Sequence, residues 1–319
     1  MQLLLTGGTG FFGKALLRHL IELESQGTVP PTIKLLTRYP AAFSRGYPEL
    51  VARPWLELIE GDVLVPSLLP RTGSFTHILH GATDSTLGLQ LSPLQRFDQI
   101  VNGTRNLLDL AIATGAVRFM LTSSGGVYGP APPGCDRFTE DYLGTADPLN
   151  PGNAYSVGKR ASEHLCALYQ EQHGLQTVIA RCFAFVGRDL PLDAHFAIGN
   201  FIRDALWRPE IVVGGNGSPV RSYMDQRDLA RWLLVLLERG PGGEAFNVGS
   251  DEGHSVRDIA YLVRDLLAPG KPVRIVGASN DNNPRNVYVP SIDKTRAALG
   301  LALRHSLSEA IVETAAHAG

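Results

Sequence analysis

Three residues have the types and the spacing for proton transfer to and from an alcohol or a carbonyl. Tyr155 and Lys159 lie four positions apart in a segment of helical periodicity, so their side chains share one helix face. A free tyrosine has a pKa of about 10, and we expect the ammonium of Lys159 to favour the phenolate and lower that pKa. The pair then works as a general base for a hydroxyl or as a general acid for a carbonyl. Ser124 ends a predicted strand, and its hydroxyl can donate to the carbonyl oxygen that oxidation forms.

The Tyr-x-x-x-Lys spacing has a plain alternative, because many helices carry it by chance. In that interpretation a half-buried tyrosine stands beside a surface lysine. The order of the chain favours chemistry, since the pair follows a glycine-rich turn and a Ser-Ser strand end.

The glycine-rich turn is TGGTGFFG at 6–13, between an apolar run and a segment of helical spacing. Each of its three spaced glycines lacks a Cβ at a place where a side chain would collide. These places are the tight turn, the close approach to a pyrophosphate, and the contact between helix and strand. The first N–H groups of the helix point at the phosphates, and the helix dipole favours negative charge there. We therefore predict a dinucleotide site, although an ordinary strand–helix turn with spare glycines is the alternative. The turn contributes Gly7, Thr9, Gly10, Phe11, Phe12 and Gly13.

Strands and helices alternate through the first half of the chain. Apolar strands are predicted at 32–36, 56–59, 76–79, 117–122 and 176–182, with helices at 93–114 and 155–171. Ser92 and Gln95 form a capping box before the first of these helices, and Gly115 is its predicted C-cap. This alternation predicts an α/β fold, a doubly wound parallel sheet of the Rossmann type.

The alternation breaks down after residue 183. Helices are expected at 196–207, 255–267 and 306–316, with Gly-, Asn- and Pro-rich loops between them. We predict a dinucleotide-binding domain over 1–183 and a smaller C-terminal α/β substrate lobe over 184–319. Segments near 228–250 are expected to return to the main sheet.

Arg38 stands at the end of the second predicted strand, where dinucleotide folds read the adenosine ribose. An acid there binds the 2′-hydroxyl of NAD, whereas an arginine accommodates the 2′-phosphate of NADP. Arg38 favours NADP, but a solvated loop arginine is the common alternative. The cofactor is therefore NAD or NADP.

Composition excludes several classes of function. The chain has 319 residues, 44% hydrophobic and 19% charged, with a net charge of -2, as in a soluble globular protein. It lacks a basic block and an apolar run of about eighteen residues, so neither nucleic acid nor membrane is an expected partner. The three cysteines lack a CxxC pair, no signal peptide is evident, and we expect a cytoplasmic protein without a metal site.

Eight stretches carry a family resemblance, in family order along nearly the whole chain. They are TGGTGFFG at 6–13, GDV at 61–63, HGAT at 80–83, NGTRNLLDLA at 102–111, SSGGVYG at 123–129, YSVGK at 155–159, RSYMDQRDLA at 221–230 and FNVGS at 246–250. With them the chain resembles an extended short-chain dehydrogenase/reductase of the NAD-dependent epimerase/dehydratase family, which acts on nucleotide sugars.

The resemblance implies roles for individual residues. It implies a catalytic trio of Ser124, Tyr155 and Lys159, in which Lys159 also holds the nicotinamide ribose. Cofactor contacts are expected from the glycine turn, from Asp62 and Val63 at the adenine, and from Gly81, Ala82, Thr83 and Asn102. Substrate contacts are expected from Thr83, Ser124, Asn200, Arg221 and Arg285, with the arginines binding the diphosphate. A homodimer formed by helices 93–114 and 155–171 is also expected.

Several positions depart from the family pattern. The 4,6-dehydratases carry Asp-Glu after the catalytic Ser or Thr, whereas this chain has Gly125 and Gly126, so we expect no water elimination. Gly126 also replaces the cysteine of members with 3,5-epimerase activity, and Cys135 in the following loop is taken as incidental. Ala184 replaces an asparagine that usually contacts the substrate phosphate.

Three functions remain open. The first is a nucleotide-sugar epimerase that acts at C4 through a transient 4-keto sugar and keeps its cofactor bound. The second is an NADPH-dependent reductase of a 4-keto-6-deoxy nucleotide sugar, which Arg38 favours. The third is a non-catalytic dinucleotide-binding sensor, against which the intact Ser124, Tyr155 and Lys159 argue.

Overall fold

The structure is a computed structural model that describes residues 1–70, 75–83, 91–277 and 286–318. Its contacts divide the chain into two compact units, each built from separate stretches. The first unit comprises Met1–Gly129, Thr145–Cys182 and Ala230–Phe246. The second comprises Pro130–Gly144, Phe183–Leu229 and Asn247–Gly319. The predicted boundary at residue 183 stays a prediction.

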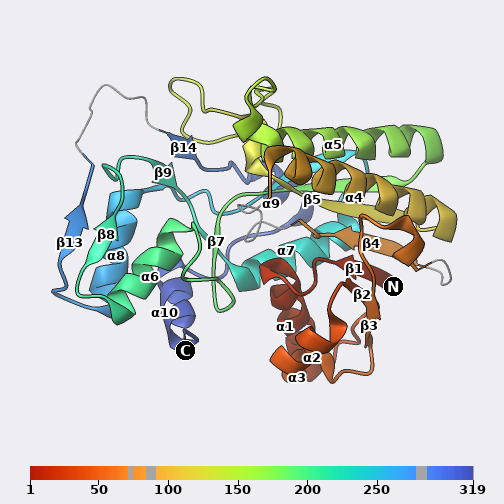
Figure 1. Ribbon diagram of the computed structural model, residues 1–319, viewed down its shortest axis with the longest axis horizontal. Helices are drawn as coiled ribbons and strands as arrows, with labels where there is room; N and C mark the ends of the chain where they lie inside the picture. Colours follow the sequence, from red (N-terminus) through yellow and green to blue (C-terminus); the bar gives the residue numbers. More distant parts are fainter. Residues whose placement is uncertain (71–74, 84–90, 278–285, 319) are drawn as a thin grey trace. The chain divides into compact units, whose positions relative to one another are not determined.

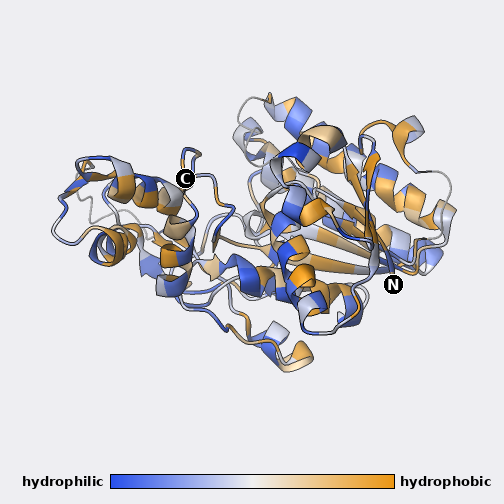
Figure 2. Ribbon diagram, turned by 90° about the horizontal axis from the view of Figure 1, so that it is seen from below, coloured by the Kyte–Doolittle hydropathy of each residue, from blue (hydrophilic) through white to orange (hydrophobic). Residues whose placement is uncertain are grey.

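The first unit is organised around a seven-stranded sheet in the order β11-β6-β5-β4-β1-β2-β3. Its strands are β1 (Gln2–Thr6), β2 (Thr32–Thr37), β3 (Leu56–Glu60), β4 (His77–His80), β5 (Arg118–Ser124), β6 (Gln176–Cys182) and β11 (Glu244–Val248). Pairings from β3 through β6 are all parallel. Leu3, Leu4 and Leu5 of β1 are buried, as expected for a parallel strand covered on both faces, and Figure 2 shows these strands as hydrophobic. The predicted doubly wound parallel sheet is confirmed.

Helices cover both faces of this sheet (Figure 1). α4 (Pro93–Thr114) and α5 (Ala154–His173) pack side by side on one face, and α1 (Phe11–Ser25) with most of α7 (Gln226–Arg239) lies on the other. The shorter elements are α2 (Pro40–Gly46), α3 (Pro48–Val51) and 3₁₀ turns at Pro66–Leu68, Gly125–Tyr128 and Pro151–Asn153. No helix among the described residues is long and apolar enough to cross a membrane.

Local sequence signals set the bounds of α4. Ser92 accepts from the Gln95 backbone while the Gln95 side chain accepts from Ser92, which confirms the predicted capping box. Gly115 ends the helix with a φ of 72°, a left-handed conformation that favours glycine.

The strand order has a topological switch point between β4 and β1. Strands β4 and β1 are neighbours, and the chain winds outward from them in opposite directions. Ligands of open α/β sheets bind at such a switch point, beyond the carboxyl ends of the strands. The glycine turn follows β1 and the sequence Gly81-Ala82-Thr83 follows β4, so both stand at this point.

The second unit contains small sheets and four complete helices among its described residues. Its strands are β7 (Phe185–Val186), β8 (Ile211–Val213), β9 (Val220–Arg221), β10 (Met224–Asp225), β12 (His254–Ser255), β13 (Val273–Ile275) and β14 (Val287–Tyr288). Its helices are α6 (Ala197–Trp207), α8 (Val256–Leu267), α9 (Asp293–Leu299) and α10 (Leu307–Ala316). β7 pairs with β10, β8 with β13, and β9 lies between β12 and β14.

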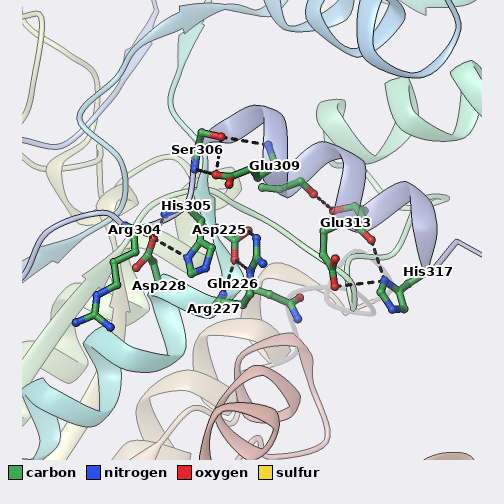
Figure 3. A network of polar contacts seen from close by, with 12 residues as sticks. Asp225, Gln226, Arg227, Asp228, Arg304, His305, Ser306, Glu309, Glu313 and His317 are labelled. Carbon is green, nitrogen blue, oxygen red and sulfur yellow. Dashed lines mark hydrogen bonds and ion pairs between the residues drawn. The ribbon is translucent and has the colours of Figure 1, made fainter. Parts of the chain in front are cut away.

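A polar network fixes the start of α10 to the start of α7 within the second unit (Figure 3). The fully buried Asp228 carboxylate accepts from the backbone N–H groups of Arg304 and His305, at 2.8 and 2.9 Å. Ser306 and Glu309 then form the capping box that begins α10.

Candidate active site

The structure brings Ser124, Tyr155 and Lys159 together inside the first unit. Ser124 is the last residue of β5, and the other two lie on the first turns of α5, which packs against β5. Lys159 Nζ donates to Thr83 Oγ1 and to the Thr122 carbonyl, each at 2.8 Å. The same atom lies 5.9 Å from the centre of the Tyr155 ring. The predicted group is therefore compact, with Thr83 as an additional partner of the lysine.

Ser124 links the strand end to the tyrosine. Its Oγ accepts from the backbone N–H of Gly126 at 3.1 Å and hydrogen-bonds the Tyr155 hydroxyl. The side chain is 7% exposed, so both contacts are held in a site that excludes most water. A donor held at this place can stabilise charge that develops on a substrate oxygen.

The prediction that Lys159 lowers the pKa of Tyr155 is wrong in its net direction. Desolvation by burial raises the pKa of Tyr155 to about 12, and the Ser124 hydrogen bond and the charge of Arg96 offset only part of that rise. Burial also lowers the pKa of Lys159 to about 8. The directions of both pKa shifts depend on distant segments that exclude water from Tyr155 and Lys159. The spacing of the two residues on one helix does not reveal this burial.

The glycine turn fits the expected cradle for a diphosphate. Gly7 has a φ of 72°, and a Cβ there would lie 2.4 Å from the Gly81 carbonyl carbon. A Cβ on Gly13 would lie 2.1 Å from the Gly8 Cα. Gly10 is the N-cap of α1 without a side-chain cap, and a Cβ there would meet nothing closer than the Gly7 oxygen at 3.4 Å. The turn thus requires glycine on its inner side and leaves the start of α1 open to an anion.

His80 belongs to the shell of this site, which the sequence did not reveal. Its Nδ1 lies 2.9 Å from Thr6 Oγ1, which also accepts from the backbone N–H of Ala82 at 3.3 Å. Burial and the Lys159 charge lower the pKa of His80 to about 3, so the ring is neutral. These bonds hold Gly81 and Ala82 against the glycine turn. A histidine ending a buried strand, directly before a glycine, is the only signal that the sequence offers for it.

The remaining predicted cofactor residues lie around the same sheet edge. Arg38 is exposed after the end of β2, with its Cζ 5.7 Å from the centre of the Tyr39 ring. One Asp62 oxygen accepts from the Leu64 backbone at 2.9 Å. Val63 is buried, and Asn102 is exposed on α4. Their contacts with a cofactor, and the preference for NADP, stay predictions.

The predicted substrate residues of the second unit have separate environments. The Asn200 side chain on α6 accepts from Arg203 at 3.0 Å. Arg221 on β9 donates to the carbonyls of Val220 and Asn286, each at 2.8 Å, and burial lowers its pKa. Arg285 lies outside the described residues.

Arg221 has the chemistry of an anion site. Its Cζ lies 6.0 Å from the centre of the Tyr288 ring, and no carboxylate among the described residues is within ion-pair distance. A partly desolvated guanidinium whose hydrogen-bond partners in the described part of the chain are carbonyls favours a phosphate oxygen.

Comparison with known proteins identifies the class of enzyme. The model of the NAD dependent epimerase/dehydratase family matches residues 3–249, and the chain belongs to this family. The sheet, the glycine turn and the Ser124, Tyr155 and Lys159 group are features of an extended short-chain dehydrogenase/reductase. The cofactor is accordingly a nicotinamide dinucleotide, and the contact of its diphosphate with Gly7 to Gly13 stays a prediction.

Two relatives are both named UDP-glucuronic acid decarboxylases. UDP-glucuronic acid decarboxylase 6 of Arabidopsis thaliana is 30% identical over 311 residues, covering 98% of this chain and 87% of that protein. UDP-glucuronic acid decarboxylase 1 of Danio rerio is 29% identical over 299 residues, covering 94% of this chain and 68% of that protein.

Solved structures share the fold along almost the whole chain. The dTDP-glucose 4,6-dehydratase DesIV of Streptomyces venezuelae, crystallised with NAD, is 25% identical with a TM-score of 0.83, covering 99% of this chain and 96% of that one. The UDP-glucose 4-epimerase of Thermotoga maritima is 21% identical with a TM-score of 0.81, covering 99% of this chain and 98% of that one. At this identity the likeness establishes a shared fold only.

Proposed function

We propose that this enzyme epimerises a nucleoside-diphosphate sugar at C4 through a transient 4-keto sugar. The observation that carries the proposal is the buried group in which Ser124 bonds Tyr155 beside the Lys159 ammonium. Tyr155 takes the proton of the C4 hydroxyl, and the Ser124 hydroxyl donates to the carbonyl oxygen that forms. Lys159 stabilises the phenolate by its charge. A bound nicotinamide dinucleotide would supply reversible hydride transfer at C4, to either face of the 4-keto sugar, and its positive charge would favour the Tyr155 phenolate.

The segment after Ser124 supports chemistry confined to C4. Gly125 and Gly126 offer no acid or base for water elimination. A Cβ on Gly126 would lie 2.7 Å from Ser156 Oγ and 3.3 Å from Ser124 Oγ, so a side chain has no room there without rearrangement. Arg221 supports a diphosphate-bearing substrate, since it is a partly desolvated cation on the second unit.

The test is a panel of UDP-, dTDP-, CDP- and GDP-sugars incubated with the purified enzyme, with products identified by NMR. We expect C4 epimers without added cofactor, and a stoichiometric nicotinamide dinucleotide released on denaturation. Tyr155→Phe is expected to retain that nucleotide and lose turnover. An empty protein that consumes NADPH with a 4-keto-6-deoxy sugar would instead establish the reductase, and a fully active Tyr155→Phe would refute the mechanism.

A second candidate is decarboxylation of a nucleotide-activated hexuronate. The Arabidopsis and Danio relatives are named UDP-glucuronic acid decarboxylases. Arg96 is close enough to lower the pKa of Tyr155, and its buried Nε has no hydrogen-bond partner among the described residues. A cation beside the reacting hydroxyl suits a sugar carboxylate.

The chemistry of this candidate needs no base to remove a proton from C5. Once C4 is a ketone, the carboxylate on C5 is β to it. The bond from C5 to the carboxyl carbon breaks, CO₂ leaves, and the electron pair passes into the ketone as an enolate. A proton from solvent is then added to C5 in place of the carboxyl group. Hydride supplied by a bound nicotinamide dinucleotide, together with the proton held by Tyr155, would restore the C4 hydroxyl.

This candidate is tested with UDP-glucuronate labelled with ¹³C at C6. Release of labelled CO₂ would establish decarboxylation, whereas a labelled 4-epimer would establish epimerisation. Arg96→Gln is expected to lower kcat/KM for the uronate by about tenfold or more, with little change for a neutral hexose. An equal loss on both substrates would exclude carboxylate recognition by Arg96.

A further inference from the structure

A third residue of α5 shares the face that carries Tyr155 and Lys159. Glu163 follows Lys159 by four positions, so all three side chains point the same way. Three consecutive residues at the end of β5 meet this face. The Thr122 carbonyl accepts from Lys159 at 2.8 Å, and Ser123 Oγ donates to Glu163 Oε1 at 2.6 Å. Ser124 forms a hydrogen bond with Tyr155. Glu163 is thus held by the strand end that presents the catalytic serine.

The Glu163 carboxylate also takes both arms of an arginine fork. Arg181 Nε donates to Oε1 at 3.1 Å and one terminal nitrogen donates to Oε2 at 2.9 Å. The side chains of Arg181 and Glu163 are 12% and 8% exposed, so the pair is largely desolvated. Such a bidentate pair fixes geometry more tightly than a surface ion pair does.

Arg181 also contacts the chain segment that follows Ser124. The other terminal nitrogen of Arg181 donates to the Tyr128 hydroxyl at 3.0 Å, and its Cζ lies 4.8 Å from the centre of that ring. Tyr128 is fully buried and ends the 3₁₀ turn that starts directly after Ser124. The network therefore holds the chain at Ser123 before the catalytic serine and at Tyr128 after it.

Glu163 acts on Lys159 by charge as well. Burial lowers the pKa of Lys159, and the negative charge of Glu163 opposes that effect. The other titratable groups facing the lysine are Cys182 on β6, Cys166 on α5 and the neutral His80 on β4, besides Tyr155. Glu163 is the carboxylate among these groups, so its charge is the one expected to keep the ammonium protonated.

We propose that Glu163 is a positioning residue, which holds the backbone around Ser124 through Ser123, Arg181 and Tyr128 and keeps Lys159 charged. The kinetic part of this inference rests on the proposed function, whereas its electrostatic part does not.

The test compares Glu163→Gln with Glu171→Gln, an exposed carboxylate on the same helix that serves as the control. Glutamine keeps the size of the side chain and removes its charge. We expect kcat of Glu163→Gln to fall about tenfold, and the alkaline limb of its kcat profile to move by about one pH unit towards lower pH. Glu171→Gln is expected to match the wild type in both.

Urea unfolding at pH 7 and pH 9.5 gives a readout without substrate or cofactor. The stability that Glu163→Gln loses relative to the wild type is expected to be smaller at pH 9.5. Lys159 is mostly neutral there, so the absent carboxylate no longer matters to it. This measurement decides the electrostatic part even if no nucleotide sugar is turned over by the wild type.

Ser123→Ala separates the mechanical part from the electrostatic part, because it removes one contact and no charge. We expect it to lower kcat without moving the alkaline limb. The proposal is overturned if Glu163→Gln leaves both the pH profile and the pH dependence of its stability loss unchanged, or if Ser123→Ala keeps full kcat.

Discussion

At the scale of single residues, burial governs the chemistry of the site. Tyr155 and Lys159 are partners by spacing, yet desolvation moves the pKa of the tyrosine up and that of the lysine down. Each shift disfavours the charged form, so neighbours that restore charge have a large influence. Glu163, Ser124 and Arg96 are such neighbours.

The neutral His80 makes folding stability depend on pH. Its folded pKa of about 3 lies below the unfolded value of 6.5, so the unfolded chain binds more protons between these values. Stability contributed by His80 is therefore present above pH 6.5 and is lost as the pH falls towards 3. From pH 7.5 to 5.5 we expect this residue to account for a loss of about 1.4 kcal/mol.

Urea unfolding of the wild type and His80→Gln at the two pH values checks this. His80→Gln is expected to be less stable than the wild type at pH 7.5. Its free energy of unfolding should fall less than that of the wild type between pH 7.5 and 5.5. The other histidines are the same in both proteins, so the difference between the two slopes reports His80. Parallel slopes would mean that His80 is protonated in the folded protein.

At the scale of elements, two close approaches at glycines shape the site. The turn between β1 and α1 touches the segment after β4, and the turn after β5 touches the start of α5. A side chain at Gly7 would collide with the Gly81 backbone, and one at Gly126 would collide with the Ser156 hydroxyl.

Gly7→Ala and Gly10→Ala are expected to separate stability from cofactor binding. Alanine at Gly7 requires a φ of 72° and meets the Gly81 carbonyl, so we expect a loss of about 3 kcal/mol or more in urea unfolding. Gly10→Ala should cost less than about 1 kcal/mol. Its methyl group stands at the open helix start, so we expect nucleotide affinity, measured by fluorescence titration, to fall about tenfold. A stable Gly7→Ala protein would contradict the packing described for this turn.

Gly126→Ala is expected to disturb Ser124, the proposed catalytic serine, through a neighbouring side chain. Its Cβ would press on Ser156 Oγ at 2.7 Å and on Ser124 Oγ at 3.3 Å, and we expect kcat to fall about tenfold. Ser156→Ala removes the closer obstacle, so the double variant should recover most of the rate. A double-mutant cycle on kcat measures this coupling, and additive effects would show that the two positions are independent.

At the scale of the whole molecule, the first unit depends on a late part of the chain. Residues 230–246 supply most of α7 and the start of the edge strand β11. Trp232, Leu233, Leu236 and Leu237 of this segment are fully buried. Each such side chain stabilises the fold by about 1.5–3 kcal/mol, so together they rival the net stability of a typical domain.

A fragment of residues 1–183 is therefore expected not to fold. It would contain the whole predicted dinucleotide site, but β6 would lack its outer neighbour and one face of the sheet would lack α7. Circular dichroism during urea titration should show a cooperative transition for 1–319 and none for the fragment. Cooperative unfolding of the fragment would show that residues 1–183 fold on their own, and it would contradict the dependence on residues 230–246.

Periodicity and local chemistry were sufficient to predict much of this protein. The parallel strands are short and mostly apolar, α4 has a capping box and a glycine end, and the glycine turn lies between strand and helix. Short-range rules therefore locate all three. The spacing of Tyr155 and Lys159 likewise places both on one face before any packing is known. These signals lie within a few residues of one another, which is the range over which backbone sterics and hydrogen bonds act.

Only the tertiary structure decided the features that join distant segments. Glu163 and Arg181 carry no sequence signal that they meet Ser123 and Tyr128, and His80 reads as an ordinary strand residue. The raised pKa of Tyr155 likewise comes from the packing of β5, β6 and α5 around it. Burial and charge act through space, so their sign and strength depend on which elements the fold places side by side.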